Sequence, residues 1–201
     1  MKKTDTEKIL EKWKSSNKKN NYQKIIATKE FLHDNSKELV NTIKGQDISF
    51  AYFFELGCGM GRNLYYLNKS YPEAEYAGND LSREECFKYM DESIKDMDFF
   101  EFDTLSLFED KVLAYYPDAV LDSDHLMHLP PESVSVILKN IVEVWEPNVF
   151  ITRRPIVGRD KMPFIWLHDY SVFQEDYELK TFKSQEDKNY VIDIYTRRDN
   201  D

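Results

Sequence analysis

The sequence predicts an α/β fold: a single Rossmann-like domain built on a doubly wound, mostly parallel sheet. Two observations favour it. From about residue 50 onward, apolar runs typical of buried strands alternate with stretches of helical periodicity, and strands joined through helices pair in parallel. The last two expected strands, 177–183 and 190–197, are separated by a short link, which indicates an antiparallel pair at the end of the chain.

The sheet needs five further strands, and each follows or precedes a helical pattern. We expect them at 50–55, 75–79, 98–102, 119–121 and 149–153. Arg62 begins the helix after the first strand. Ser82 and Glu85 form a capping box for the next helix, on which Cys86, Met90 and Ile94 follow at four-residue spacing. Pro130-Pro131-Glu132 opens the helix before the fifth strand, because proline is well placed in a first helical turn.

The region before the first strand is expected to be helical. Apolar positions indicate helices around Ile9–Trp13, Tyr22–Phe31 and Ser36–Lys44, the last ending at Gly45. We therefore divide the chain into a helical cap or lid, residues 1–45, and an α/β domain, residues 46–201. At 201 residues the two together fit one structural domain.

A glycine-rich turn directly after the first strand is the strongest functional signal. It reads Glu55-Leu56-Gly57-Cys58-Gly59-Met60-Gly61. Alternate glycines allow a sharp turn and a close approach of a ligand to the backbone. The following helix begins with free N–H groups, which favour a nucleotide-like ligand. The dinucleotide fingerprint G-x-G-x-x-G is an alternative, but its third glycine would fall on Arg62.

The observed spacing, E-x-G-x-G-x-G, resembles motif I of the class I S-adenosylmethionine-dependent methyltransferases. An acid at the end of the first strand suits a ligand that carries a sulfonium and an amino group better than it suits an anionic pyrophosphate. The resemblance covers residues 50–154 well and identifies no subfamily. It implies seven strands in the order 3-2-1-4-5-7-6 with strand 7 antiparallel, S-adenosyl-L-methionine as cofactor, and methyl transfer as the reaction.

Ligands of such sheets bind at the carboxyl ends of the strands, and four expected strands end near an acid. Asp80 lies 23 residues after Gly57, where the family's ribose-binding acid belongs. Asp103 and Thr104 match the position that contacts adenine. By this resemblance the cofactor-binding residues are Glu55, Gly57, Gly59, Gly61, Asp80, Leu81, Asp103, Thr104 and Asp122.

Two histidines follow the fourth strand, in a stretch similar to the family's post-strand-4 region. His125 and His128 are the candidate catalytic residues, because an imidazole there can take a proton from the acceptor. Packing against the cofactor or capping a helix is an equally good interpretation of either histidine. For the acceptor we expect contacts from His168 and Tyr170 after the fifth strand, and from Trp13 and Tyr22 in the N-terminal lid.

The chain lacks the sequence motifs of nucleic-acid methyltransferases and of metal sites. Asp122-Ser123-Asp124-His125 stands where amino-methylating nucleic-acid enzymes carry [DNS]-P-P-[YFW], and the Pro-Cys nucleophile of cytosine C5 enzymes is missing. Cys58 and Cys86 give neither a disulfide framework nor a metal spacing, so we assign no metal. The net charge of −10 makes nucleic acid an unlikely partner, although residues 1–30 carry +5.

The expected function is methyl transfer to a small-molecule acceptor. Two alternatives stay open: a cofactor-binding regulatory or interaction protein without catalysis, and a nucleic-acid methyltransferase that uses the basic N-terminal arm. No segment has the pattern of a signal peptide or a membrane span, so we expect a cytoplasmic protein. The acceptor and the oligomeric state are left open.

Overall fold

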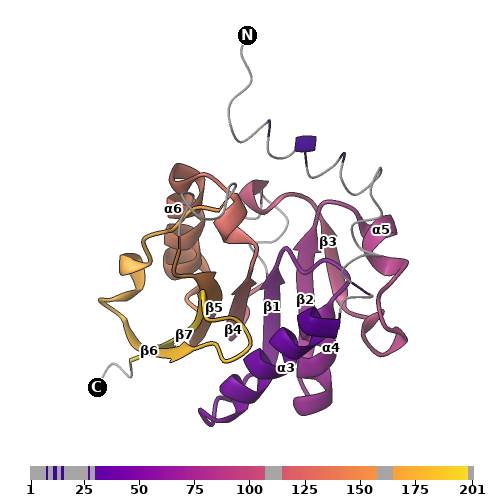
Figure 1. Cartoon of the computed structure of the whole chain (residues 1–201), viewed down its shortest axis with the longest axis horizontal. Coiled ribbons are helices and arrows are strands. Elements are labelled where there is room, and N and C mark those ends of the chain that lie inside the picture. Colours follow the sequence, from indigo (N-terminus) through magenta and orange to yellow (C-terminus); the bar gives the residue numbers. More distant parts are fainter. Residues whose placement is uncertain are drawn as a thin grey trace.

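The computed structural model describes residues 8, 11, 12, 15, 27, 30–106, 115–157 and 165–198. Its centre is a seven-stranded sheet in the order β3-β2-β1-β4-β5-β7-β6 (Figure 1). β7 pairs antiparallel with both β5 and β6, and the other strand pairs are parallel. The predicted fold class, strand order and antiparallel strand 7 are therefore confirmed. The strands are β1 (Tyr52–Leu56), β2 (Glu75–Asp80), β3 (Asp98–Glu101), β4 (Ala119–Ser123), β5 (Val149–Pro155), β6 (Tyr177–Lys183) and β7 (Tyr190–Arg197).

Helices cover both faces of the sheet. α3 (Glu30–Lys44) and α4 (Arg62–Ser70) lie side by side on one face, where Leu39 and Leu67 join a core with Phe53 and Ile194 of the strands (Figure 1). α6 (Pro131–Asn140) and the π-helical turn η4 (Ile141–Trp145) pack on the other face. Short helical turns complete the connections: α5 (Arg83–Phe87), η1 (Glu92–Ile94), η2 (Thr104–Ser106), η3 (Leu126–His128) and η5 (Ser171–Phe173).

Helix α3 begins earlier than the sequence predicted. This helix was expected at Ser36–Lys44, but it already runs from Glu30. Ser36 does not act as an N-cap, because its hydroxyl donates to Asn63 on the neighbouring helix α4, at 2.6 Å. A tertiary contact thus replaces the local capping bond that makes serine a helix-starting residue.

The helix after β2 is shorter than predicted. Ser82 caps α5 by accepting from the Glu85 amide at 3.4 Å, but the Glu85 carboxylate pairs with Lys88. Met90 and Ile94 were expected on this helix and lie beyond its end. Asp91 accepts from both the amide and the hydroxyl of Ser93, which starts the separate turn η1. Side-chain bonds of this kind compete with helical ones.

Within the described part of the chain, no helix combines the length and the apolar character needed to cross a membrane.

Candidate cofactor and acceptor site

The glycine turn connects β1 to α4 with three left-handed glycines. Gly57, Gly59 and Gly61 have φ of 60°, 55° and 73°. Gly61 is the N-cap of α4 and offers no side chain to the first turn of that helix. A left-handed backbone favours glycine over residues with a Cβ, which explains the alternating glycines locally. The amides of Gly57, Gly59 and Gly61 are bonded within the protein, to Asn79, Asp80 and Cys58 respectively.

Glu55 is buried near the end of β1 with only one of its two carboxyl oxygens satisfied. Oε1 accepts from Asn63 Nδ2 at 2.6 Å, whereas Oε2 is buried and has no hydrogen-bond partner. Burial raises the pKa of Glu55 to about 8, against the opposing effect of the Asn63 bond. A buried oxygen without a partner marks a place where a polar ligand group fits.

Asp80 ends β2 and holds the glycine turn. Its Oδ2 accepts from the Gly59 amide at 3.0 Å, and its Oδ1 accepts from the Leu81 amide at 2.6 Å. Burial raises the pKa of Asp80, while these two amides act in the opposite direction. An ionised carboxylate has about four lone-pair sites. Both oxygens therefore keep capacity for further donors such as ribose hydroxyls, and Leu81 lies directly beside them.

Asn79 connects three strand ends and was not predicted from the sequence. Its Oδ1 accepts from the Gly57 amide at 3.4 Å, and its Nδ2 donates to the Phe102 carbonyl at 3.3 Å and the Thr104 hydroxyl at 3.1 Å. Asn79 is 1% exposed. A polar amide in an otherwise buried strand was a usable signal, since buried polar groups require partners. Asp103, next to Thr104, accepts from the Ser106 amide at 3.2 Å.

His125 lies across the turn, between the ends of β4 and β3. Its Nε2 is 2.6 Å from the Thr104 hydroxyl, and a Cβ placed on Gly57 would lie 2.2 Å from its Nδ1. The space beside Gly57, which the sequence assigned to an approaching ligand, is therefore occupied by this imidazole. Burial, assisted by His128, lowers the pKa of His125 to about 4, so the ring is neutral at neutral pH.

Asp122, within β4, anchors the loop that carries the two histidines. Its Oδ1 accepts from the Leu126 amide at 2.9 Å, and its Oδ2 from the Thr152 hydroxyl at 3.0 Å and the Tyr170 hydroxyl at 3.2 Å. Burial raises its pKa to about 6. Because protein groups surround both oxygens, the role of Asp122 in this geometry is to fix the loop, and Tyr170 turns its hydroxyl toward that loop.

The segment after β5 lies directly on the same loop. The Trp166 amide donates to the Met127 carbonyl at 2.9 Å, and His168 Nε2 donates to the Leu126 carbonyl at 2.8 Å. This bond fixes the tautomer, because a carbonyl only accepts, and it leaves a lone pair on the buried Nδ1 of His168, which has no partner. His128 closes η3 through its amide, 3.0 Å from the His125 carbonyl.

Two of the predicted acceptor contacts, Trp13 and Tyr22, lie outside the described residues. Among the residues that the structure does describe, no three His, Cys, Asp or Glu side chains are grouped as a metal site requires. The two arginine side chains of β5 form ion pairs. Arg153 binds both carboxylate oxygens of Asp124 at 2.6 Å, and Arg154 binds Asp193 at 2.6 Å.

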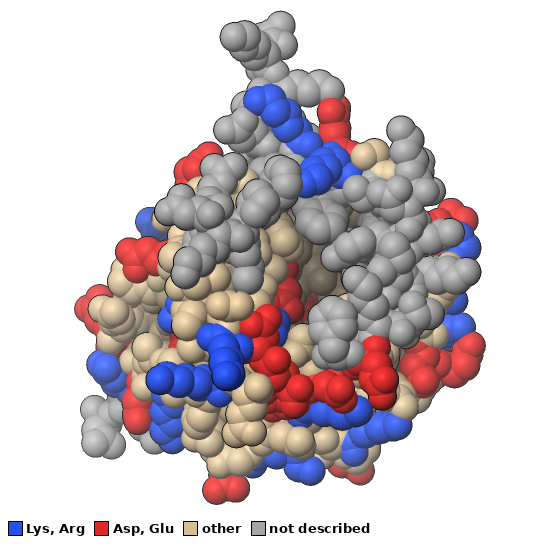
Figure 2. All heavy atoms as spheres, in the orientation of Figure 1, with Lys and Arg blue, Asp and Glu red and all other residues tan. Residues whose placement is uncertain are grey.

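Acidic side chains gather at the carboxyl ends of these strands. Figure 2 shows a hollow near the middle of this face, with acidic side chains gathered at its lower edge. The buried and half-buried acids at the strand ends are Glu55, Asp80, Asp103, Asp122 and Asp124. Such a site attracts a cationic ligand and repels a polyanion.

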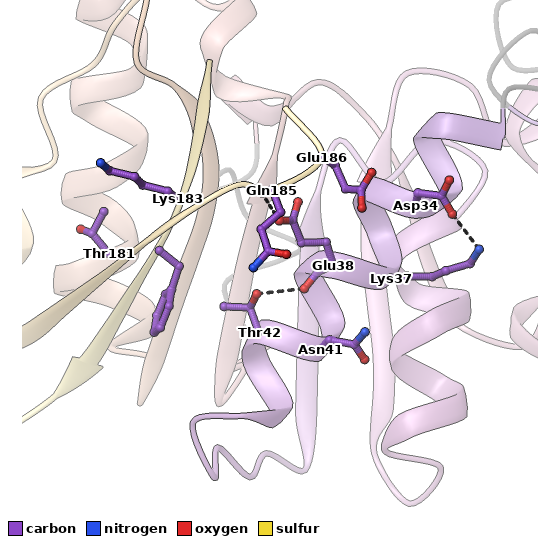
Figure 3. Close-up of a pocket in the computed structure, with 10 residues that line it drawn as sticks. Asp34, Lys37, Glu38, Asn41, Thr42, Thr181, Lys183, Gln185 and Glu186 are labelled. Carbon is purple, nitrogen blue, oxygen red and sulfur yellow. Dashed lines mark hydrogen bonds and ion pairs between the residues drawn. The ribbon is translucent and has the colours of Figure 1, made fainter. Parts of the chain in front are cut away.

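A second hollow lies away from these strand ends, between α3 and the β6–β7 hairpin (Figure 3). It has a volume of about 630 Å³. Asp34 and Lys37 on its wall pair with each other at 2.8 Å, and Glu38 accepts from Ser184 and from the Gln185 amide. These bonds satisfy much of its polar wall, and they join α3 to the hairpin.

The comparisons with known proteins agree with this geometry. Residues 54–151 match the sequence profile of a family described as a methyltransferase domain. That stretch contains β1 to β5, and thus the glycine turn and the strand-end acids. In this stretch the chain resembles the class I S-adenosylmethionine-dependent methyltransferases, and it has their fold. It is an enzyme of the methyltransferase kind, and solved structures of the same fold hold bound S-adenosylmethionine or S-adenosylhomocysteine. No curated protein matches the chain in sequence.

Solved methyltransferase structures share the fold. Magnesium protoporphyrin IX methyltransferase from Synechocystis PCC 6803, with bound S-adenosylmethionine, superposes with a TM-score of 0.74 at 15% identity, covering 98% of this chain and 100% of that one. Human N-acetylserotonin methyltransferase gives 0.62 at 12% identity, covering 88% of this chain and 53% of that one. An O-methyltransferase family protein from Burkholderia thailandensis gives 0.60 at 13%, covering 85% and 60%.

The residues of this site fit S-adenosylmethionine at two points. The unsatisfied oxygen of Glu55 can accept from the ammonium group, and Asp80 has capacity for the ribose hydroxyls.

Proposed function

We propose that this methyltransferase transfers a methyl group to a small-molecule acceptor rather than to a nucleic acid. The observation that carries the proposal is the acidity of the site: acids stand at the carboxyl ends of β1, β2 and β4, and the two nearby arginines on β5 are paired with Asp124 and Asp193. A nucleic-acid enzyme needs cations along the path of the phosphates.

The similarity of fold to magnesium protoporphyrin IX methyltransferase, which covers 98% of this chain, supports the proposal, since that enzyme's name states a small-molecule acceptor. The human N-acetylserotonin enzyme points to the same class of acceptor.

The cofactor site of the proposal uses the residues assigned from the sequence. When bound, S-adenosylmethionine supplies an electrophilic methyl group on a sulfonium. Glu55 would accept from its ammonium group, Asp80 and Leu81 would hold the ribose, and Asp103 and Thr104 would border the adenine. Gly57, Gly59 and Gly61 form the turn beneath the cofactor, and Asp122 fixes the loop above β4.

The acceptor site of the proposal lies where the β4 loop, residues 122–129, meets the segment 166–170. Backbone and side-chain bonds hold these two segments together, and both combine imidazole with apolar groups. His125 and His128 are the proposed proton acceptors for a hydroxyl or amine nucleophile. The depressed pKa of His125 means that it holds such a proton weakly, which favours His128 for that role.

The test follows the transferred label. Incubation of the protein with tritiated-methyl S-adenosylmethionine and fractionated cell extract is expected to place the label in the low-molecular-mass fraction. Parallel reactions with total RNA and with DNA are expected to give no acid-precipitable label. Label that enters only precipitable nucleic acid would overturn the small-molecule proposal while leaving the methyltransferase activity in place.

A further inference from the structure

A directed series of hydrogen bonds runs from helix α3 to the acid of the glycine turn. Arg62 Nε donates to the Ser36 hydroxyl at 2.8 Å, and Ser36 donates to Asn63 Oδ1 at 2.6 Å. Asn63 Nδ2 then donates to Glu55 Oε1 at 2.6 Å. Each group donates to the next, so the series has one direction and ends on the carboxylate.

The three side chains at the end of this series are buried. Ser36 is 1% exposed, Asn63 4% and Glu55 2%. Each is therefore held in one geometry by its neighbours. The Asn63 amide has only one useful orientation, because its oxygen must face the serine hydroxyl and its nitrogen the carboxylate.

We propose that Asn63 and Ser36 are positioning residues for cofactor binding: by occupying Oε1 of Glu55, they direct Oε2 toward the ammonium group of S-adenosylmethionine. The inference rests on the proposed placement of the cofactor's amino-acid end at Glu55. Neither residue touches the cofactor in this arrangement. They act through Glu55, and they make α3 part of the cofactor site.

The electrostatic surroundings agree with this role. Arg62 favours the ionised form of Glu55, whereas Asp122 and Asp80 disfavour it, and burial disfavours it most. An ionised Glu55 thus depends on the Asn63 bond together with a cationic group on its other oxygen. The ammonium group of the cofactor is such a cation.

The experiment compares two ligands on two pairs of matched variants by isothermal titration calorimetry. S-adenosylhomocysteine carries the amino-acid end, and 5′-methylthioadenosine lacks it. Asn63→Ala is paired with Asn68→Ala, because Asn68 on the same helix bonds the Ser93 carbonyl at 3.3 Å. Ser36→Ala is paired with Thr42→Ala, whose hydroxyl bonds the Glu38 carbonyl of α3 at 2.9 Å.

Asn63→Ala and Ser36→Ala are expected to weaken the binding of S-adenosylhomocysteine roughly tenfold, the scale of one hydrogen bond to a charged group. The affinity for methylthioadenosine is expected to change less than about twofold. The two control variants should bind both ligands like the wild type. Equal weakening of both ligands would mean a general loss of structure and would overturn the inference, as would unchanged binding of S-adenosylhomocysteine. If Asn63→Ala does not fold, Ser36→Ala decides alone. Wild-type protein that binds neither ligand would instead overturn the cofactor placement itself.

Discussion

A buried carboxyl with one free oxygen, as in Glu55, makes the stability of the protein depend on pH. Its pKa is about 8 in the folded protein, against an ordinary value of 4.5. The folded state therefore holds a proton that the unfolded state has released between these values. The resulting stabilisation is complete below pH 4.5 and is lost as the pH rises through 8.

Glu55→Gln should remove this dependence, because the amide does not titrate. We expect the free energy of unfolding of the wild type, minus that of the variant, to fall between pH 5 and pH 8 in urea titrations. Each unit of pKa shift corresponds to about 1.4 kcal/mol. Glu101→Gln, at an exposed acid of β3, is the control and should run parallel to the wild type. A constant difference across this range would contradict the prediction.

Asp80 should affect both the ligand and the empty protein, because its carboxylate accepts from two backbone amides of the turn region. We expect Asp80→Ala to weaken the binding of S-adenosylhomocysteine by about 1.5–3 kcal/mol and to lower the free energy of unfolding by about 1–2 kcal/mol. Asp80→Asn keeps one acceptor and should lose less stability. Unchanged affinity in Asp80→Ala would show that the ribose is held elsewhere.

Individual site residues could be predicted from the sequence where the fold family fixes their position at a strand end. Glu55 and Asp80 could be found because the resemblance fixes acids at strand ends, and the structure puts both beside the glycine turn. Asn79, Asn63 and Ser36 were missed. Their partners lie 8 to 27 residues away, and no local pattern encodes which side chain on a neighbouring element a buried amide will meet.

Elements were predicted well where hydrophobic period and turn residues agree. β6 and β7 have the expected bounds, and α6 begins at the expected prolines. The errors occurred where a polar side chain decides between two local structures. Ser36 bonds across to α4 and lets α3 continue, and Asp91 starts the separate turn η1 beyond the end of α5. Apolar spacing alone could not detect the break, since Met90 and Ile94 are buried in either arrangement.

The junction between the β4 loop and the segment after β5 depends on Tyr170. Tyr170→Phe removes the donor to Asp122 at 3.2 Å. We expect about 1 kcal/mol less stability and a fall in the rate of methyl transfer, with nearly unchanged affinity for S-adenosylhomocysteine, because the loop is proposed to border the acceptor. Tyr177→Phe, which loses a bond to the Pro147 carbonyl at 2.8 Å, is the matched control. An equal fall in rate in both variants would assign the effect to stability alone.

At the scale of the whole molecule, helix α3 packs against the β6–β7 hairpin near the C-terminal end of the chain. α3 shares a core with Ile192 and Ile194 of β7. The sheet order followed from the resemblance to the family, but the contact of α3 with the β6–β7 turn had no signal in the sequence. The residues that meet there are 146 and 147 positions apart.

Glu38 carries this contact and gives the last prediction. One carboxylate oxygen accepts from the Ser184 hydroxyl at 2.6 Å. The other accepts from the Gln185 amide at 2.5 Å (Figure 3). Glu38→Ala removes both acceptors, so we expect a loss of about 1–3 kcal/mol in the free energy of unfolding. Affinity for S-adenosylhomocysteine should not change, because Glu38 lies at the second hollow and not at the strand ends. Glu186→Ala, in the wall of the same hollow, is the control for a lost surface charge. Weaker ligand binding in Glu38→Ala would show instead that the hairpin and the cofactor site are coupled through α3.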